Sequence, residues 1–156
     1  MAVVAANQKT SQAALVSALG TAISGAGKVY TTVYGNRAAS SQASGTPALW
    51  CVSAGERRAQ PWAGTPKFNN YFRFRLETFV DDVDAEQSWL RSNVEDKLND
   101  CCQALAQAIS DNRHNAAWKE LYFDDAYSTI EPGKLDQIWG WLITQHVIVE
   151  VEDTIT

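Results

Sequence analysis

The chain has 156 residues and a mass of 17.2 kDa, and 46% of its residues are hydrophobic while 20% are charged. These values predict one folded domain, residues 1–156, with a packed core, and they exclude a wholly disordered chain. Three cysteines and two histidines, none at metal-ligand spacing, argue against a disulfide scaffold or a structural zinc site. No apolar run reaches the roughly 18 residues of a membrane helix. We therefore expect no cofactor, no metal and no membrane partner.

The net charge of −5 is unevenly distributed along the chain. Residues 1–67 contain six basic residues and one acidic residue, which gives +5, whereas residues 68–156 contain seven basic and seventeen acidic residues, which gives −10. One interpretation is that the basic half of one copy meets the acidic half of another. The other is that both halves interleave in one fold, so that their charges mix on its surface.

The first predicted element is a short amphipathic helix over residues 10–24. Leucine or isoleucine recurs there at every fourth position, with alanines beside it. Thr10 or Ser11 can cap the start of the helix, and Gly25 with Gly27 can end it.

Two extended segments and two loops follow this helix. Residues 29–34 are dense in β-branched and aromatic side chains and predict a strand or extended arm, and residues 49–53 predict a short strand. Residues 35–47 are small and polar, and residues 55–70 are interrupted by proline and glycine. Both of these segments predict long loops.

The clearest strand is predicted over residues 71–80. Apolar and charged side chains alternate there with a period of two, so one face is buried and the other is wet, which favours an antiparallel or mixed sheet. The side chains expected in the core are Phe72, Phe74, Leu76 and Val80, and those expected on the wet face are Arg73, Arg75 and Glu77.

The main helix is predicted over residues 84–110. Asp84 can cap this helix, and Gln87 can complete a capping box. Apolar side chains recur at steps of three or four and form one continuous stripe. The stripe consists of Leu90, Val94, Leu98, Cys101, Leu105 and Ile109.

Two more strands are predicted at the end of the chain, over residues 118–130 and 139–152, with a turn at Pro132 and Gly133. The order of all these elements predicts an α/β (α+β) fold. One mostly antiparallel or mixed sheet would pack against the long helix and the shorter N-terminal helix.

Candidate active sites are poorly supported by the sequence. Residues 25–28, Gly-Ala-Gly-Lys, lack the first glycine and the final serine or threonine of a phosphate loop. Asp81, Asp82, Asp84 and Glu77 could in principle collect a divalent metal. However, strand alternation directs the first two to opposite sides, and Asp84 is expected to cap the helix. Because the histidines lack a catalytic motif as well, we predict that no residue is catalytic.

The six tryptophans are more than one core of this size needs. Tryptophan and arginine are enriched at interface hot spots, so we predict contacts between copies of the chain. Exposed ion pairs would orient these contacts, and Trp62 in its proline-rich loop would supply affinity. The predicted basic residues are Arg37, Arg57 and Arg58, and the predicted acidic residues are Asp81, Asp82, Asp124 and Asp125. The last two are equally suited to a bulge or a strand edge.

The sequence also resembles a known family in the order of its segments. An alanine-rich helix is followed by Gly-Lys-Val-Tyr (residues 27–30), Trp-Cys-Val-Ser (50–53), an aromatic strand that ends in Asp-Asp (71–82), a long helix and two closing strands. This order resembles the tail-terminator and neck proteins of long-tailed bacteriophages, which join tail to head.

The resemblance implies a structural virion protein and not an enzyme. It implies a ring, a homohexamer, at the head-proximal end of the tail, which ends tail-tube growth. Its partners would be the tail tube protein below and the head-side connector or stopper protein above, with DNA passing through the lumen without specific binding. The ring would be assembled in the host cytoplasm and located in the virion. The alternatives are a head-completion or stopper protein of the neck and, from another class, a small metal-dependent phosphohydrolase built on Asp81, Asp82 and Glu77.

Overall fold

The structure, a computed structural model, describes residues 3–35, 46–58, 69–125 and 127–155. Its elements in chain order are β1 (Val3–Val4), α1 (Gln8–Ile23), β2 (Thr32–Tyr34), β3 (Ala48–Arg58), β4 (Asn69–Asp81), the 3-10 helix η2 (Val83–Gln87), α2 (Ser92–Asp111), β5 (Glu120–Phe123), β6 (Thr129–Leu135), β7 (Ile138–Glu152) and β8 (Thr154–Ile155). The fold is α+β with a mixed sheet, as the sequence predicts. No helix in this described part of the chain is long and apolar enough to cross a membrane.

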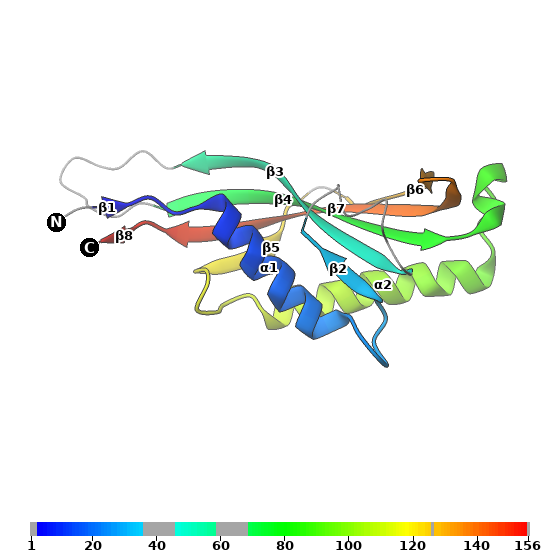
Figure 1. Ribbon diagram of the computed structural model, residues 1–156, viewed down its shortest axis with the longest axis horizontal. Coiled ribbons are helices and arrows are strands. Elements are labelled where there is room, and N and C mark those ends of the chain that lie inside the picture. The colour runs from blue at the N-terminus through cyan, green and yellow to red at the C-terminus, as the bar shows by residue number, and fades with distance from the viewer. Residues whose placement is uncertain (1–2, 36–45, 59–68, 126, 156) are drawn as a thin grey trace.

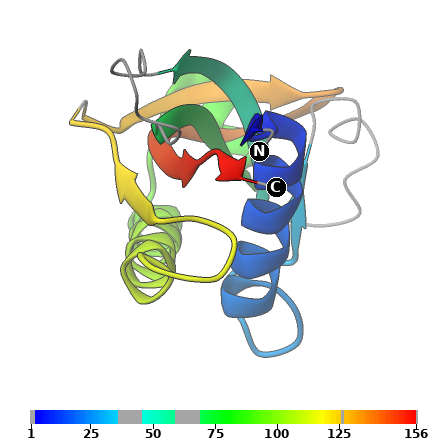
Figure 2. The same cartoon turned by 90° about the vertical axis from the view of Figure 1, so that its left-hand side faces the viewer.

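The main sheet is built around the two long strands β4 and β7. Its strand order is β2-β3-β4-β7-β5, and β6 pairs with the part of β7 that β5 leaves open. β2 is parallel to β3, and the other neighbours are antiparallel. β1 and β8 form a separate pair near the two ends of the chain. β3, β4 and β7 run along the long axis of the molecule, and α1 and α2 lie on the same side of the sheet (Figures 1 and 2).

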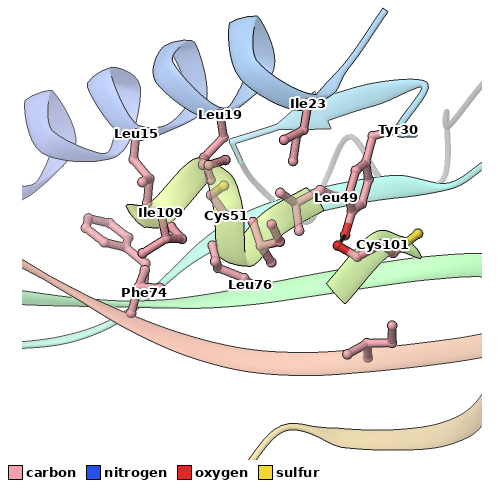
Figure 3. Packing of buried hydrophobic residues seen from close by; sticks show 14 of the residues in the cluster. Leu15, Leu19, Ile23, Tyr30, Leu49, Cys51, Phe74, Leu76, Cys101 and Ile109 are labelled. Atoms are coloured by element: carbon pink, nitrogen blue, oxygen red, sulfur yellow. Dashed lines mark hydrogen bonds between the residues drawn. The ribbon is translucent and has the colours of Figure 1, made fainter. Parts of the chain in front are cut away.

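The core lies between this sheet and the two helices. Figure 3 shows side chains of α1 and α2 meeting those of β3 and β4. The apolar side of β4 is confirmed, as is the apolar stripe of α2 from Val94 onward. The wet face is confirmed only in part, because Glu77 is buried and β4 is buried on both faces from Leu76 to Val80. The buried residues are Leu15, Leu19 and Ile23 of α1, Phe72, Phe74, Leu76 and Val80 of β4, and Val94, Leu98, Cys101, Leu105 and Ile109 of α2.

Tyr30 connects three of the elements that surround this core. It precedes β2, which is only the end of the predicted extended arm, and its ring is buried. The phenol oxygen shares a hydrogen bond with Thr78 Oγ1 (2.8 Å) and donates to the carbonyl of Cys101 (3.3 Å). Burial raises the pKa of Tyr30 above its ordinary value and raises the pKa of Cys51 and Cys101 to about 12. These groups are therefore neutral and pack as parts of the core.

The N-terminal helix begins earlier than predicted. Instead of Thr10 or Ser11, Asn7 caps α1, because its side chain accepts a hydrogen bond from the Lys9 N–H (2.8 Å). Asparagine is among the best residues for this position. The end of the helix agrees with the prediction to within one residue.

The helix predicted over residues 84–110 is divided in two. The side chain of Asp82, and not that of Asp84, caps η2 by accepting the Asp84 N–H (3.2 Å). Ser88 then adopts a left-handed conformation (φ 59°), which ends η2, and α2 begins four residues later. Leu90 lies in the connection between them and is 40% exposed, so its predicted place in the core is wrong.

β3 and β4 are longer than predicted and take up both ends of the loop expected over residues 55–70. Gly55 (φ 126°) lies at a bulge that lets β3 continue past its predicted end. Residues 59–68 of that loop, and residues 36–45 of the loop expected over residues 35–47, lie outside the described residues.

The strand predicted over residues 118–130 is in fact two strands, β5 and the start of β6, which pair with different parts of β7. The predicted turn at Pro132 and Gly133 is wrong, because both residues lie inside β6. Proline is tolerated there because β6 is an edge strand. The turn falls at Asp136 and Gln137, where Asp136 has a φ of 56°.

Two outer edges of the sheet are occupied by other parts of the chain. Along β3, the side chains of Gln8 and Gln12 on α1 donate to the carbonyls of Gly55 (3.1 Å) and Cys51 (2.8 Å). Along β5, a strand N–H donates to the carbonyl of Arg113 in the segment after α2 (2.8 Å). These contacts cover backbone groups that would otherwise pair with a strand from another chain.

The first prediction compares two leucines of the expected stripe. Leu98→Asp places an unpaired carboxylate in the core, and we expect it to lower the free energy of unfolding by about 3 kcal/mol or more. Leu90→Asp is the matched control, because Leu90 is 40% exposed, and we expect a loss below about 0.5 kcal/mol. Urea unfolding followed by circular dichroism measures both. Equal losses would contradict the placement of these residues.

Candidate functional site

Asp82 is a buried carboxylate between the end of β4 and η2. Its Oδ1 accepts hydrogen bonds from Arg91 Nη2 (2.8 Å) and from the Asp84 N–H (3.2 Å), and its Oδ2 accepts one from Trp141 Nε1 (3.1 Å). The Asp82 side chain is fully buried, while Arg91 is half exposed and also pairs with Asp84 (3.0 Å). The arrangement fixes the connection between β4 and α2 against β7.

The donors around Asp82 also determine its protonation state. Burial raises the pKa of Asp82, but the hydrogen bonds from Trp141, from Arg91 and from the backbone of Asp84 outweigh burial and hold the pKa below its ordinary value. The carboxylate is therefore ionised at neutral pH, with both oxygens bound within the chain. This is the chemistry of a structural ion pair.

The other carboxylates of the candidate metal site point elsewhere. Asp81 is exposed and accepts a hydrogen bond from Thr46 Oγ1, so Asp81 and Asp82 lie on opposite sides of β4 as predicted. Glu77 is buried on the helix-free face of the sheet, where Arg75 Nε lies 2.8 Å from its Oε1. Among the described residues, no three histidine, cysteine, aspartate or glutamate side chains group as metal ligands would.

Arg58, predicted to contact another copy, is engaged within its own chain. Its guanidinium pairs with Glu56 (3.3 Å), donates to Asn70 Oδ1 (3.1 Å) and to the carbonyl of Ala6 (3.0 Å), and lies over the ring of Phe72. It thereby holds the segment before α1 against β4.

A second contact holds the two ends of the chain together. Asp153, which is 3% exposed, accepts a hydrogen bond from the Ala6 N–H (2.8 Å) and another from the Asn70 side chain. We name this group of residues, Ala6, Arg58, Asn70 and Asp153, the terminal clamp.

The remaining predicted contact residues are divided. Asp124 pairs with Arg73 of the same chain (2.9 Å), and Asp125 is exposed just after β5. Arg37 and Trp62 lie outside the described residues.

One end of the molecule carries exposed apolar side chains that the sequence analysis did not single out. η2 packs there beside the turn between β6 and β7, opposite the end that holds the termini (Figure 1). The exposed side chains are Val83 (79%), Trp89 (65%), Leu90 (40%) and Ile138 (57%). We name them the apolar end. The sequence does not reveal this surface, because Leu90 lies four residues before Val94 and so fits the spacing of the apolar stripe of α2.

A hollow of about 420 Å³ lies on the helix-free face of the sheet, between β3, β4, β5 and β7. It is lined by Ala54, Gly55, Glu56, Arg57, Tyr71, Arg73, Tyr122 and Ile148. We name it the tyrosine hollow. Arg57, predicted as a contact residue, is exposed and lies over the ring of Tyr71, 5.3 Å from its centroid. Burial and the nearby charge of Glu150 raise the pKa of Tyr122, so this phenol is protonated at neutral pH.

Comparison of the sequence with protein-family models and with curated proteins finds no match. The resemblance to phage tail proteins therefore stays an expectation. What the described residues offer is an end with exposed apolar side chains and a hollow on the helix-free face of the sheet.

The second prediction concerns the buried carboxylate. Because the pKa of Asp82 in the folded chain is lowered, its stabilising effect is complete above its unfolded pKa, near 4, and is lost as the pH falls through the folded value. We expect Asp82→Asn to lower the free energy of unfolding by about 2 kcal/mol at neutral pH. The difference from the wild type should shrink in acid, as urea unfolding at a series of pH values will measure.

Asp84→Asn is the matched control, because Asp84 shares Arg91 but its side chain is 33% exposed. We expect this variant to lose less than about 1 kcal/mol. If the deficit of Asp82→Asn were the same in acid as at neutral pH, the ion pair would not be what Asp82 contributes.

Proposed function

We propose that the chain is a structural assembly protein that forms a ring at the head-proximal end of the tail of a long-tailed bacteriophage. There it ends growth of the tail tube and joins the tail to the head-side connector. The proposal is supported by the resemblance of the sequence to tail-terminator and neck proteins. The described elements follow the same order: a helix, a short arm, a tryptophan-bearing strand, an aromatic strand ending in Asp-Asp, a long helix and closing strands.

The observation that carries the proposal is the apolar end. Four large apolar side chains are exposed on the segments that lie at this end, namely η2, the connection from η2 to α2, and the start of β7. Soluble proteins that work alone rarely expose contiguous apolar patches, and such patches mark contacts with other proteins. The exposed tryptophan is the residue type most enriched at interface hot spots.

The overall charge is also consistent with a ring around DNA. DNA binding depends on basic contacts that neutralise phosphates. A chain with a net charge of −5 supplies few of them, so DNA can pass through the lumen without being held. Metal-dependent hydrolysis has less support, because Asp81, Asp82 and Glu77 do not converge and Asp82 is bound by Arg91 and Trp141.

The third prediction is the assembly itself. Native mass spectrometry of the purified protein over a range of micromolar concentrations should show a closed species of six subunits. Negative-stain electron microscopy should show rings with a central lumen. A monomer at every concentration would contradict the proposal.

Tube growth separates a tail terminator from a head-completion protein. When the rings are added to the polymerising tail tube protein of the same phage, we expect tubes that are shorter and capped at one end. A head-completion protein would leave tube length unchanged. As a matched control, Asp100→Ala, which removes an exposed carboxylate of α2 outside the apolar end and the tyrosine hollow, should cap tubes as the wild type does.

A further inference from the structure

We propose that the apolar end of one copy seats in the tyrosine hollow of the next copy, which makes the contact between subunits heterologous. This inference rests on the proposed function and specifies how its ring is held together. The proposed occupant of the hollow is a second copy of this chain, and the group that enters it is Trp89.

The two surfaces match in chemistry. Trp89 is 65% exposed, with Val83 and Leu90 exposed beside it. The hollow offers two aromatic rings, Tyr71 and Tyr122, and about 420 Å³ of space, a volume within the range of small-molecule binding pockets. An indole placed among tyrosine rings gains aromatic contacts beyond the burial of its area.

The charges around the two surfaces are opposite in sign. Within residues 81–91, which include most of the apolar end, Arg91 pairs with Asp82 and Asp84, which leaves Asp81 and Glu86 as the carboxylates without an ion pair to a described residue. In the lining of the hollow, Arg73 pairs with Asp124 and Glu56 pairs with Arg58, which leaves the positive charge of Arg57. Arg57 and Glu86 are both exposed, and neither forms an ion pair with another described residue. Asp81 is exposed as well, but it accepts a hydrogen bond from Thr46 of its own chain. The geometry therefore pairs Arg57 of one copy with Glu86 of the next.

The positions of the surfaces make this a contact between copies. The apolar end is at one end of the long axis, and the hollow lies on the β3 and β4 segments that lead to the termini at the other (Figure 1). Two different patches on opposite ends of a subunit form a head-to-tail contact, which closes into a ring when the rotation between copies permits. We do not expect the copies to join by strand addition at β3 or β5, because side-chain and loop groups of the same chain already bond to those edges.

Two sets of variants test the contact by sedimentation velocity across a concentration series. Trp89→Ala should raise the concentration for half-assembly by roughly thirtyfold at any salt concentration. Its control, Tyr127→Ala, removes a fully exposed aromatic ring outside both surfaces and should have no effect.

Arg57→Glu and Glu86→Arg should each weaken assembly, chiefly at low salt. The charge-swapped double variant should recover assembly, while Lys28→Glu, an exposed control of equal charge change, should leave it unchanged.

A cross-linking experiment tests the direction of the contact. Ala54→Cys lies in the hollow and Gln87→Cys lies beside Trp89. Under mild oxidation, a disulfide between chains should form when the two single variants are mixed, and not in either variant alone or in the wild type. A disulfide in one variant alone would indicate a symmetric contact and overturn the heterologous arrangement.

The outcomes separate this inference from the proposed function. If the wild type forms rings that Trp89→Ala leaves intact, or if the charge swap fails to recover assembly, the contact is wrong while the ring stands. If the wild type remains monomeric at every concentration, the ring and the contact are both wrong. Circular dichroism and thermal unfolding of each variant must match the wild type, so that a loss of assembly is not a loss of folding.

Discussion

The ladder between β4 and β7 fixes the position of almost every other part of the molecule. All thirteen residues of β4 have a partner on β7, from Asn69 opposite Glu152 to Asp81 opposite Gly140. Because side chains alternate along a strand, a slip of one residue would turn the core side of β4 to solvent. The same register directs Tyr71 and Ile148 to the helix-free face, where the tyrosine hollow forms. The core and the hollow are therefore two consequences of one pairing.

How well the sequence predicts an element depends on whether the residues that determine the element are close to one another in the sequence. The period of two in β4 as far as Leu76 and the stripe from Val94 onward are repeated over many residues, so each position supports its neighbours, and both are confirmed. The burial of Glu77 could not be predicted, because it depends on what covers the other face of the sheet. The start of α2 could not be predicted, because Asp82 is held by Trp141, fifty-nine positions away. The turn after β6 was misplaced, because proline is found in turns but is also tolerated in an edge strand, and β6 is an edge strand. Arg57, predicted as a contact residue from its charge, lines the tyrosine hollow, and its contact stays a prediction. Trp89 was not singled out, because it stands beside Leu90, whose spacing continues the apolar stripe back past the start of α2.

The uneven charge along the sequence does not survive as two separate faces. β3 from the basic half lies beside β4 from the acidic half, so the two halves interleave in one sheet. The ion pairs among the described residues each join two groups of the same half. Arg73 holds Asp124, and the guanidinium of Arg58 is used in the terminal clamp. The second interpretation of the charge pattern is therefore the better description of the described residues. Exposed charged groups outside these ion pairs remain in both halves of the sequence, so a charge count over a whole half cannot identify an interface.

The terminal clamp has a consequence for how the chain could be rearranged. β1 and β8 pair side by side, with Val3 opposite Ile155, and Asp153 ties the segment before α1 to the end of β7. A short peptide could join the old ends, and the polypeptide could be opened at the Asp136–Gln137 turn instead, without breaking the β4–β7 ladder. In a closed assembly of identical copies, the β1–β8 pair would be repeated at equal angular intervals on one circle. A sequence appended to either end would be displayed there as a regular array, one per subunit.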